Sequence, residues 1–293
     1  MDPHLLRTFV TVARLASFSD AARDLGYTQS AVSQHIAALE ADLGLPLLTR
    51  RPVAPTPAGE RLLEHAGALL LRLDAARADL DRFAAAPRAT LDVAASPLAL
   101  TPRTLAALPA TGATLRGLPR EEVPAAVATG EADAGLVDGI AAPSDPLRLT
   151  DVAPLAATAV AEEPLAVVLP AHHPLAGRPG VRLDDLVDAR WLDAPDAGIP
   201  LDRLRAVHGG PAGRGFRDAL RYEGTDTRTL AALAAAGHGL ALLPLPAARE
   251  VPGAAAVPLV APRLVHRTEL LLPAAAGGEP TGPVAEFVRR LKR

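Results

Sequence analysis

The stretch that most constrains the fold is Phe18–Gly44, FSDAARDLGYTQSAVSQHIAALEADLG, because it has the pattern of two short helices joined by a tight turn. We expect the first helix at Ser19–Leu25, with Ser19 as the N-cap that accepts hydrogen bonds from the first turn. Gly26 follows, where a left-handed residue most easily ends a helix. Thr28 is also an N-cap type and starts the second helix. The pattern predicts a helix-turn-helix.

The second helix has one apolar and one polar face. Tyr27 and the valine five residues later have the spacing of a hydrophobic staple. The expected buried face consists of Val32, Ile36, Leu39 and Leu43. The opposite face has no acid before Glu40 and carries Gln29, Ser30, Ser33, Gln34 and His35. Such a face suits the DNA major groove. An ordinary helical pair that never binds DNA stays an alternative at this point.

Composition excludes several chemistries. The chain has 293 residues, 49% of them apolar, which is enough for two or three domains. Its formal net charge is −3, so any nucleic-acid surface must be local. It has no cysteine, which removes disulfides, thiolate metal sites and thiol redox switches. Its only lysine is Lys292, which excludes a Gly-Lys-Ser/Thr phosphate loop and an internal Schiff-base lysine.

Nothing in the sequence suggests a membrane. The chain does not open on a basic stretch followed by an apolar one, as a signal peptide does. Apolar runs such as Gly239–Leu245 are far too short to cross a bilayer. We therefore expect a soluble, cytoplasmic protein with no membrane partner.

Two further segments flank the helix-turn-helix. Leu5–Leu15 is expected to form a helix that packs under the pair and completes a three-helix unit. After Gly44, the prolines of LPLLTRRPVAPTPAG forbid a long helix. We expect a small β-wing in which Arg50 and Arg51 contact phosphates. The alternative is an exposed loop whose arginines only aid solubility.

A long helix is expected from Ala58 to about Ala86. In this segment, two interleaved series of apolar residues recur every seven positions, over about three to four heptads. They are Leu62, Leu69, Ala76 and Phe83, and Ala66, Leu73 and Leu80. The spacing predicts a dimer seam, and a dimer would place two reading helices on two half-sites of a palindrome. The alternative is a single helix lying on its own domain.

Beyond Arg88, strands and helices alternate. Strands are expected at 91–96, 114–118 and 132–139 with a helix at 120–129, an order that predicts a mostly parallel sheet. Residues 155–170 predict two strands separated by Glu162-Glu163-Pro164. A second half is expected to contain helices near 183–187, 201–207 and 225–236, and strands around Trp191, 220–224, 239–244 and 266–274. An amphipathic helix, Thr281–Leu291, ends the pattern.

The N-terminal part closely resembles the LysR-type transcriptional regulators. The matching residues are LLRTFVTVARLASFSDAARDLGYTQSAVSQHIAALEADLGLPLLTR, followed by TPAGERLL. Downstream, VVLPAHHPLAG and AAAGHGLALLP fit the same family. The resemblance implies an α+β multidomain protein. Its parts are a winged helix-turn-helix, a long linker helix and two α/β regulatory subdomains like those of periplasmic solute-binding proteins.

This organisation divides the chain into residues 1–57 (DNA-binding domain), 58–88 (linker and dimerisation helix) and 89–293 (effector-binding domain). Subdomain I would take about 89–160 and 266–293, and subdomain II about 161–265. The wing departs from the family pattern. Leu48 stands where the family usually has Phe, Pro55 replaces the usual Leu, and the hairpin is shorter by about two residues.

The resemblance also implies site residues and partners. Gln29, Ser30, Ser33 and Gln34 would face bases or phosphates, and Thr28, Arg50 and Thr56 would hold the DNA backbone, with Arg51 beside them. The implied partners are double-stranded DNA with a palindromic promoter site, a small-molecule effector and a further copy or copies in a homodimer or homotetramer. RNA polymerase is a further partner that the resemblance allows. No cofactor or metal is expected.

The effector site is expected beyond the carboxyl ends of the strands, where open α/β sheets bind ligands. Three segments qualify: Ser96–Thr101, Asp138 with Gly139, and Thr225–Thr227. We expect them to converge on a cleft between the subdomains, with contacts from Ser96, Leu98, Thr101, Gly139, Thr225 and Asp226. The alternative is that each Ser or Thr is an ordinary N-cap. Ser96 and Thr225 on distant surfaces would refute the site.

Other motifs favour plain structural interpretations. His172 and His173 precede a proline in a turn and lack partners at metal-ligand spacing. GGPAGRG (Gly209–Gly215) favours a loop over a phosphate cradle, and no Gly-x-Ser-x-Gly elbow is present. The leading hypothesis is a ligand-responsive transcription factor. A cytoplasmic solute-binding module without a transcriptional role is the alternative. An enzyme on the α/β half is a third hypothesis, for which no nucleophile with its base is found.

Overall fold

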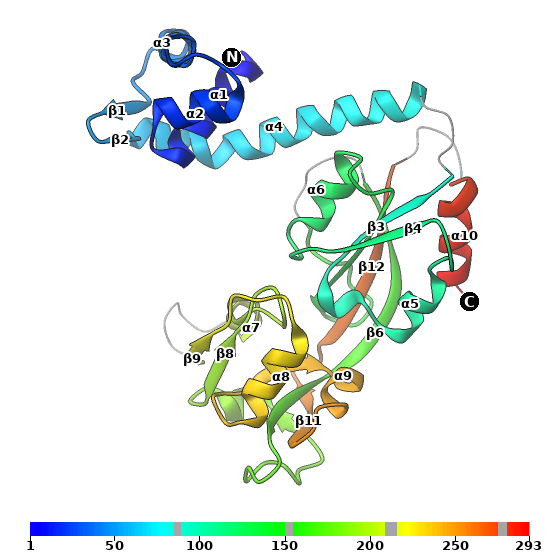
Figure 1. The fold of residues 1–293 in the computed structure, drawn as a ribbon. Helices are drawn as coiled ribbons and strands as arrows, with labels where there is room; N and C mark the ends of the chain where they lie inside the picture. The colour runs from blue at the N-terminus through cyan, green and yellow to red at the C-terminus, as the bar shows by residue number, and fades with distance from the viewer. Residues whose placement is uncertain (85–88, 150–154, 209–215, 275–279, 293) are drawn as a thin grey trace. The chain divides into compact units, whose positions relative to one another are not determined.

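The computed structural model describes residues 1–84, 89–149, 155–208, 216–274 and 280–292 (Figure 1). The chain divides into two compact units, Met1–Ala78 and Asp79–Arg293. This division falls inside the long helix α4, Pro57–Ala84. The proposed domain limits at 57/58 and 88/89 stay predictions.

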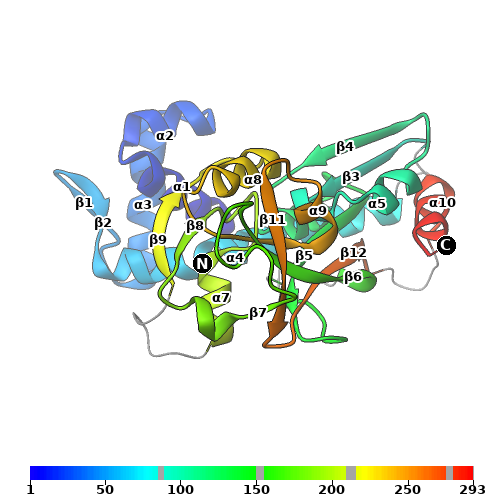
Figure 2. The ribbon, with the colours of Figure 1, turned by 90° about the horizontal axis from the view of Figure 1, so that it is seen from below.

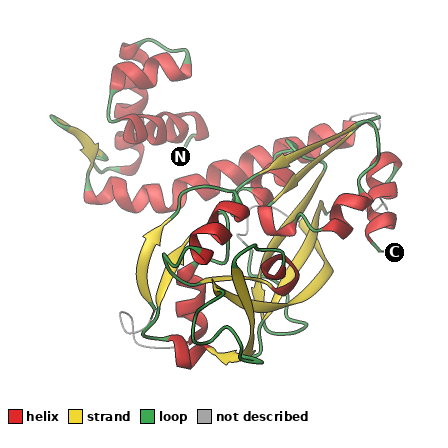
Figure 3. Cartoon of the chain, turned by 60° about the horizontal axis from the view of Figure 1, so that its bottom comes forward, coloured by secondary structure: helices red, strands yellow, loops and turns green. Residues whose placement is uncertain are grey.

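The N-terminal unit consists of helices with one small hairpin (Figure 3). Its elements are α1 (Pro3–Leu15), α2 (Phe18–Leu25), α3 (Gln29–Leu43), β1 (Leu48–Arg50), β2 (Val53–Pro55) and the first part of α4. Phe9 and Val12 of α1, Ala21 of α2, and Val32 and Ile36 of α3 are fully buried and join the three helices in one core. The predicted helix-turn-helix and wing are both present.

The caps of α2 and α3 explain where the helices begin and end. Ser17, not Ser19, is the N-cap of α2, because its extended backbone lets its hydroxyl accept from the Asp20 N–H at 3.2 Å. The predicted N-cap of α3 is confirmed, since Thr28 accepts from Ala31 N–H at 3.2 Å. Gly26 ends α2 with φ +70° as expected, a conformation that glycine adopts without strain.

Two expectations for α3, those for Leu43 and His35, need correction, and the staple between Tyr27 and Val32 stays a prediction. Leu43 is 38% exposed instead of buried, and it is the last residue of the helix, before the C-cap Gly44. Tyr27 is 45% exposed, and its ring meets the ring of His35 edge-on with 5.2 Å between centroids. His35 Nδ1 lies 3.1 Å from Thr8 Oγ1 on α1. His35 is thereby tied to its own domain and does not stand free on the polar face.

Helix α4 is continuous over Pro57–Ala84, whereas its predicted end at Ala86 lies outside the described residues. Its heptad positions differ in exposure. Ala66 is fully buried in the N-terminal core, so it has no surface left for a second chain. Leu62 and Leu73 are half-buried, Ala76 is exposed, and Leu69 and Leu80 are 46% and 72% exposed. The Phe83 side chain lies outside the described part.

The C-terminal unit is built on a sheet with strand order β4-β3-β5-β12-β6-β11-β7. Strands β4 (Ala113–Gly117), β3 (Leu91–Ala95) and β5 (Ala134–Ala141) run parallel, as predicted. Helices α5 (Pro102–Ala107) and α10 (Gly282–Leu291) cover one face of this part, and α6 (Val123–Ala128) covers the other. Helix α6 is shorter than the predicted helix 120–129, which leaves Arg120 in the turn that follows β4.

The next pairs along this sheet are antiparallel, so the parallel order predicted from residues 91–139 holds for those strands and does not extend through the whole unit. Strand β12 (Val265–Pro273) pairs antiparallel with β5 and with β6 (Leu155–Pro170). Strand β6 is a single strand of 16 residues, not the two strands predicted. Its first half pairs with β12, and its second half pairs with β10 (Ala241–Pro244) and β11 (Ala254–Ala261). Pro164, which has no N–H to donate, stands where the partners change.

The second half of the unit surrounds the far end of β6. It contains β7 (Val181–Arg182), η2 (Leu183–Leu186), β8 (Arg190–Asp193), α7 (Leu201–His208), β9 (Arg217–Arg221), α8 (Thr227–Ala235) and α9 (Leu245–Arg249). Helices α8 and α9 lie beside β11 (Figure 2). Strand β9 pairs parallel with β8 and begins three residues before the predicted strand 220–224. Strand β11 and helix α9 had no counterpart in the sequence prediction.

Candidate functional site

The polar face of α3 is open to solvent in the N-terminal unit. Thr28, Gln29, Ser30 and Gln34 are exposed, and Ser33 is half-buried. The acid that follows, Glu40, turns back to its own domain, where its Oε1 accepts from the N–H groups of residues 47 and 48 at 2.7 and 3.2 Å. The exposed start of α3 therefore presents hydroxyl and amide groups without a carboxylate among them.

The wing places its two arginines differently. The Arg50 guanidinium lies 4.9 Å from the centroid of the Phe18 ring, a cation–π contact with the start of α2. Arg51 is exposed in the turn between β1 and β2. The Thr56 hydroxyl donates to the Pro46 carbonyl at 2.7 Å and accepts from Gly59 N–H at 3.1 Å. It caps α4 and so already has partners within the chain.

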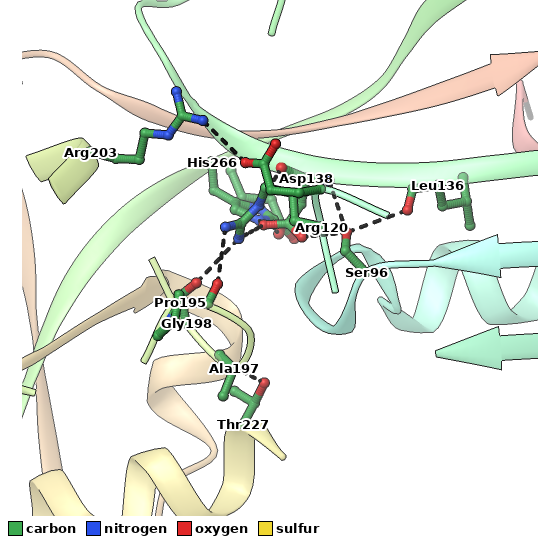
Figure 4. A network of polar contacts seen from close by, with 12 residues as sticks. Ser96, Arg120, Leu136, Asp138, Pro195, Ala197, Gly198, Arg203, Thr227 and His266 are labelled. Atoms are coloured by element: carbon green, nitrogen blue, oxygen red, sulfur yellow. Dashed lines mark hydrogen bonds and ion pairs between the residues drawn. The ribbon is translucent and has the colours of Figure 1, made fainter. Parts of the chain in front are cut away.

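A second polar cluster lies in the C-terminal unit, where three strands and one turn meet (Figure 4). Asp138, near the end of β5, is completely enclosed. Its carboxylate accepts from Ser96 Oγ at 2.5 Å and from Arg120 Nη2 at 2.7 Å, and it lies 3.1 Å from His266 Nε2 on β12. His266 Nδ1 lies 3.6 Å from a carboxylate oxygen of Glu163.

Contacts within this cluster shift the pKa values of Asp138 and His266. Burial alone would raise the pKa of Asp138, but the Arg120 guanidinium, together with His266 and Ser96, holds that pKa well below its usual range. Burial alone would lower the pKa of His266, but its bonds to Asp138 and Glu163 raise it above the ordinary value. The Arg120 guanidinium thus faces the Asp138 carboxylate, and the two carboxylates beside His266 favour its protonated form.

Arg120 joins the two subdomains. Its Nε donates to the Asp138 carbonyl at 2.7 Å, while Nη2 and Nη1 reach the carbonyls of Gly198 and Pro195 at 3.2 and 3.4 Å. Thr227, in the first turn of α8, donates to the Ala197 carbonyl at 2.8 Å. The turn 195–198 is thus held from both sides, as Figure 4 shows. We name Arg120, Asp138, Ser96 and His266 the interdomain cluster.

A cavity of about 340 Å³ adjoins the interdomain cluster. Its walls come from the turn around Arg120 and Glu121, the end of β5, residues 145–149 and the start of α7 with Arg203. Arg203 Nη2 lies 3.1 Å from Glu121 Oε1, a second ion pair between the subdomains. The remaining lining is mostly apolar, which is typical of small-molecule sites.

A further ion network supports one wall of the cavity. Arg267 pairs with Glu162 and, at 2.6 Å, with Glu269. These two carboxylates accept backbone N–H bonds from Ser144 and Leu147, each at 3.1 Å. Strands β6 and β12 therefore hold the segment 144–147 in place.

The predicted effector residues have different surroundings. Gly139 lines the cavity, and a Cβ there would lie 2.9 Å from Leu147 Cδ2. Ser96 is buried in the interdomain cluster, and Leu98 packs in the core of the second subdomain. The other three lie at helix starts: Thr101 accepts from Thr104 N–H, Asp226 caps α8, and Thr225 is exposed. The N-cap alternative thus describes Thr101 and Asp226, while the cluster connects Ser96 to the turn that Thr227 holds.

The sequence prediction omitted Arg120, Arg203 and His266. Arg120 lies three residues beyond the end of β4, where the strand-end rule applies, but the sequence prediction assigned it to the helix 120–129. His266 and Arg267 are buried polar residues in a strand that is otherwise rich in leucine, and such residues mark a partnered site. Nothing in the sequence marks Arg203 as a site residue, because charged residues are common on the polar face of an amphipathic helix.

The remaining motifs fit structural interpretations. His173 lies in the predicted turn, where its Nδ1 is 3.2 Å from Leu175 N. In the described part of the chain, no three His, Cys, Asp or Glu side chains form a group that could hold a metal ion. The glycine-rich segment 209–215, predicted as a loop, lies outside the described residues. Among the helices that the structure describes, none has the length and apolarity to cross a membrane.

Relatives of the chain are regulators. A Mycobacterium avium protein named "Probable hydrogen peroxide-inducible genes activator" is 38% identical over 197 residues, 64% of this chain and 60% of the relative. The HTH-type transcriptional regulator PgrR of Escherichia coli is 44% identical over 90 residues, 30% of each chain. These alignments thus span less than two thirds of either relative. In solved structures, full-length CbnR complexed with its target DNA has TM-score 0.51 and 25% identity, covering 100% of this chain and 99% of that one.

Family models match both parts of the chain. Residues 3–60 match the bacterial regulatory helix-turn-helix proteins of the lysR family. Residues 84–293 match the LysR substrate binding domain. The two matches occur in the same order as the helical unit and the two-subdomain unit. The chain therefore belongs to the LysR family of bacterial helix-turn-helix regulators.

Proposed function

We propose that this chain is a sequence-specific DNA-binding regulator of transcription whose promoter binding responds to a small-molecule effector. One observation supports the proposal: an exposed polar face without carboxylates at the start of α3 shares a chain with a two-subdomain unit that has a cavity between its halves. The first part suits the major groove, and the second suits a metabolite. Family membership supports the same pairing of roles. A bacterial chromosome lies in the cytoplasm, so that is where we expect the protein to act.

The proposed DNA contacts divide into two kinds. Gln29, Ser30, Ser33 and Gln34 would read base edges or nearby phosphates from α3, where Gln pairs well with adenine. Thr28, Arg50, Arg51 and Thr56 would hold the phosphate backbone and set the register without reading sequence. Because the Thr56 hydroxyl already has two partners in the chain, its share would be smaller than that of the arginines.

Binding to a palindromic promoter site requires at least two copies. The exposed apolar side chains of α4, Leu69 and Leu80, support a helix–helix contact between copies as a homodimer or homotetramer. RNA polymerase is a further proposed partner, as for a regulator that acts at promoters. We assign no catalytic residue, because family membership implies a regulator and not an enzyme.

The effector would act through the interdomain cavity. A ligand changes DNA binding only if it binds the DNA-competent arrangement and the other arrangement unequally. A response to peroxide, suggested by the name of one relative, cannot use thiol chemistry here because the chain has no cysteine. A solute-binding module without a transcriptional role is the second candidate, since the two-subdomain unit alone would suffice for it.

Operator binding at several salt concentrations tests the DNA assignment. A sequence selected from random duplexes serves as operator, and Gln29→Ala and Arg50→Ala are compared by fluorescence anisotropy. Arg50→Ala should weaken binding to all sequences and lower the salt slope by about one, because a phosphate contact is lost. Gln29→Ala should cost about 1–3 kcal/mol on the operator and relax its sequence preference.

Arg61→Ala is the matched control, because Arg61 is an exposed arginine of α4 that pairs with Glu64 at 2.7 Å. It should bind as the unsubstituted protein does. Unchanged binding in both test variants would remove the assignment of these contacts. Failure to select any preferred sequence would contradict the regulator and favour the solute-binding module.

A further inference from the structure

Tyr27 joins the turn of the helix-turn-helix to the recognition helix α3. It lies directly before Thr28, the N-cap of α3. Its backbone is fixed, because its N–H donates to the Ala22 carbonyl at 2.9 Å and so completes the end of α2. Its side chain is 45% exposed. The recognition helix therefore begins beside a large aromatic side chain that is in part open to solvent.

A series of contacts holds the Tyr27 ring in place. The ring meets that of His35 on α3 edge-on, with 5.2 Å between centroids, a favourable arrangement for two aromatic rings. His35 Nδ1 lies 3.1 Å from the Thr8 hydroxyl of α1. Thr8 is buried and gives its hydroxyl hydrogen to the His4 carbonyl at 2.9 Å, so toward His35 it can only accept. The His35 ring is therefore anchored through Nδ1–H to the core of the N-terminal unit.

The hydroxyl at the end of the Tyr27 ring is free to bind a partner. Among the residues that the structure describes, none forms a hydrogen bond with Tyr27 Oη, and this atom is not buried. A tyrosine side chain has only two torsions to fix, and here the ring is already held. A hydrogen bond from this hydroxyl to another molecule thus costs little additional side-chain entropy.

The place of this hydroxyl favours the phosphate backbone of DNA over the bases. A recognition helix contacts base edges through its own first residues, and Tyr27 precedes the helix. The contact with His35 places the ring at the flank of α3 nearest to α1, because His35 is bonded there to Thr8. A helix in the major groove has phosphates along its flanks, and tyrosine hydroxyls are common donors to phosphate oxygens.

We infer that Tyr27 is a further DNA-contacting residue whose hydroxyl donates to a phosphate oxygen, and that His35 is the positioning residue that holds its ring. The inference rests on the proposed function, because it adds a contact to the proposed DNA interface. A hydrogen bond to a phosphate oxygen is charge-assisted and therefore stronger than one between neutral groups. It reads no base, and a neutral hydroxyl displaces no counterion as a bound cation does.

The substitution Tyr27→Phe tests the contact, because it removes the hydroxyl and keeps the ring. Fluorescence anisotropy should show binding weakened by about ten-fold on the selected operator and on unrelated duplexes alike, because a phosphate contact is lost. The salt slope should stay the same, in contrast to that of Arg50→Ala, because no cation is removed.

Tyr222→Phe is the matched control for the loss of a tyrosine hydroxyl. Tyr222 is the other tyrosine of the chain and directly follows β9 in the C-terminal unit. This variant should bind DNA as the unsubstituted protein does.

Methylphosphonate substitution in the operator locates the phosphate. At one position at a time, a methyl group replaces a charged phosphate oxygen. At one phosphate of each half-site, this change should weaken binding of the unsubstituted protein more than that of Tyr27→Phe, because only the former has a hydrogen bond to lose there.

Two variants of His35 test its positioning role. His35→Ala should weaken operator binding about five-fold, because the Tyr27 ring loses its support. In the Tyr27→Phe background the same substitution should have almost no effect, whereas a general loss of stability would lower binding in both backgrounds. His35→Phe keeps a ring against Tyr27 and should restore most of the affinity. Circular dichroism measures the melting temperature of each variant.

Two outcomes would overturn the phosphate contact: unchanged operator binding in Tyr27→Phe, and equal losses in both proteins at every methylphosphonate position. Equal losses from His35→Ala with and without the tyrosine hydroxyl would overturn the positioning role. If the unsubstituted protein selects no operator, the proposed function itself fails. If it binds an operator and Tyr27→Phe binds equally well, only the Tyr27 contact is refuted.

Discussion

His266 is the residue whose protonation matters most in the C-terminal unit. Its imidazole lies between Asp138 and Glu163, and both carboxylates stabilise the charged form. Its pKa in the folded chain is therefore above the ordinary value of 6.5. A group with a raised folded pKa contributes stability fully below its unfolded value, and this contribution is lost as pH rises through the folded value.

We therefore expect the C-terminal unit to lose thermal stability as pH rises from 6.5 through the raised pKa of His266. The single tryptophan, Trp191, is buried in this unit and reports its unfolding by fluorescence. The variant His266→Gln serves as the reference, because it cannot titrate. Its melting temperature should be lower at pH 6 and should change less with pH. A parallel pH dependence in both proteins would contradict the role of His266.

At the scale of elements, Glu40 couples the recognition helix to the wing. Its side chain accepts from the N–H groups of Leu47 and Leu48, just before and at the start of β1. Gly59 completes this junction, because a Cβ there would lie 2.1 Å from the Leu47 carbonyl oxygen. The angle between α3 and the wing thus depends on a few close backbone contacts.

Replacing Glu40 with alanine leaves two backbone N–H groups without their acceptor. We expect Glu40→Ala to destabilise the N-terminal unit by about 1–3 kcal/mol and to weaken operator binding, because the wing loses its fixed position. Glu40→Gln keeps a carbonyl oxygen in place and should recover most of both. Chemical denaturation and anisotropy measure the two effects. Operator binding that is unaffected in Glu40→Ala would show that the wing needs no such support.

The sequence predicted the elements whose signals are local. The turn at Gly26 and the cap at Thr28 depend on residues within one turn of each other, and both were found. Strand β6 was missed because its continuity depends on distant partners: β12 pairs with it up to Pro164 and β10 from Leu165 onward. A proline beside two glutamates looks like an interruption when those partners are unknown.

The difference between local signals and contacts of distant residues also explains which parts of the candidate site could be predicted from the sequence. The rule of strand ends selected Gly139, which lines the cavity, and Ser96, which is buried in the interdomain cluster; their contact with an effector stays a prediction. It could not show that Arg120 would reach Pro195 and Gly198, because those contacts join residues far apart in the sequence. Nor could it show that Asp226 would use its carboxylate to cap α8, since capping and ligand binding use the same residue types.

For the whole molecule, the question is how many copies act together. Leu69 and Leu80 leave apolar surface on α4, whereas Ala66 is covered by its own unit. The dimer seam, if formed, must therefore use the exposed part of the heptad pattern and not all seven predicted positions.

Leu80→Glu should weaken self-association by more than about ten-fold, because a charge would enter an apolar helix–helix contact. Sedimentation velocity across a concentration series measures the change. Affinity for a palindromic operator should fall toward that for a single half-site. Val260→Glu provides the control, since Val260 is 52% exposed on β11 and outside the seam. Equal self-association of the two variants would place the interface elsewhere.

The uninterrupted β6 has a mechanical consequence for any signal that starts in the cavity. Strand β6 runs through both subdomains. It pairs with β12 up to Pro164 and with β10 and β11 beyond that residue. Since proline has no N–H to donate to a neighbouring strand, β6 can bend at Pro164 without breaking a backbone hydrogen bond donated by that residue. A fixed pivot makes the sliding of one lobe past the other unfavourable and leaves rotation as the easy motion. Small angular changes at this point then become larger displacements at the outer ends of the lobes.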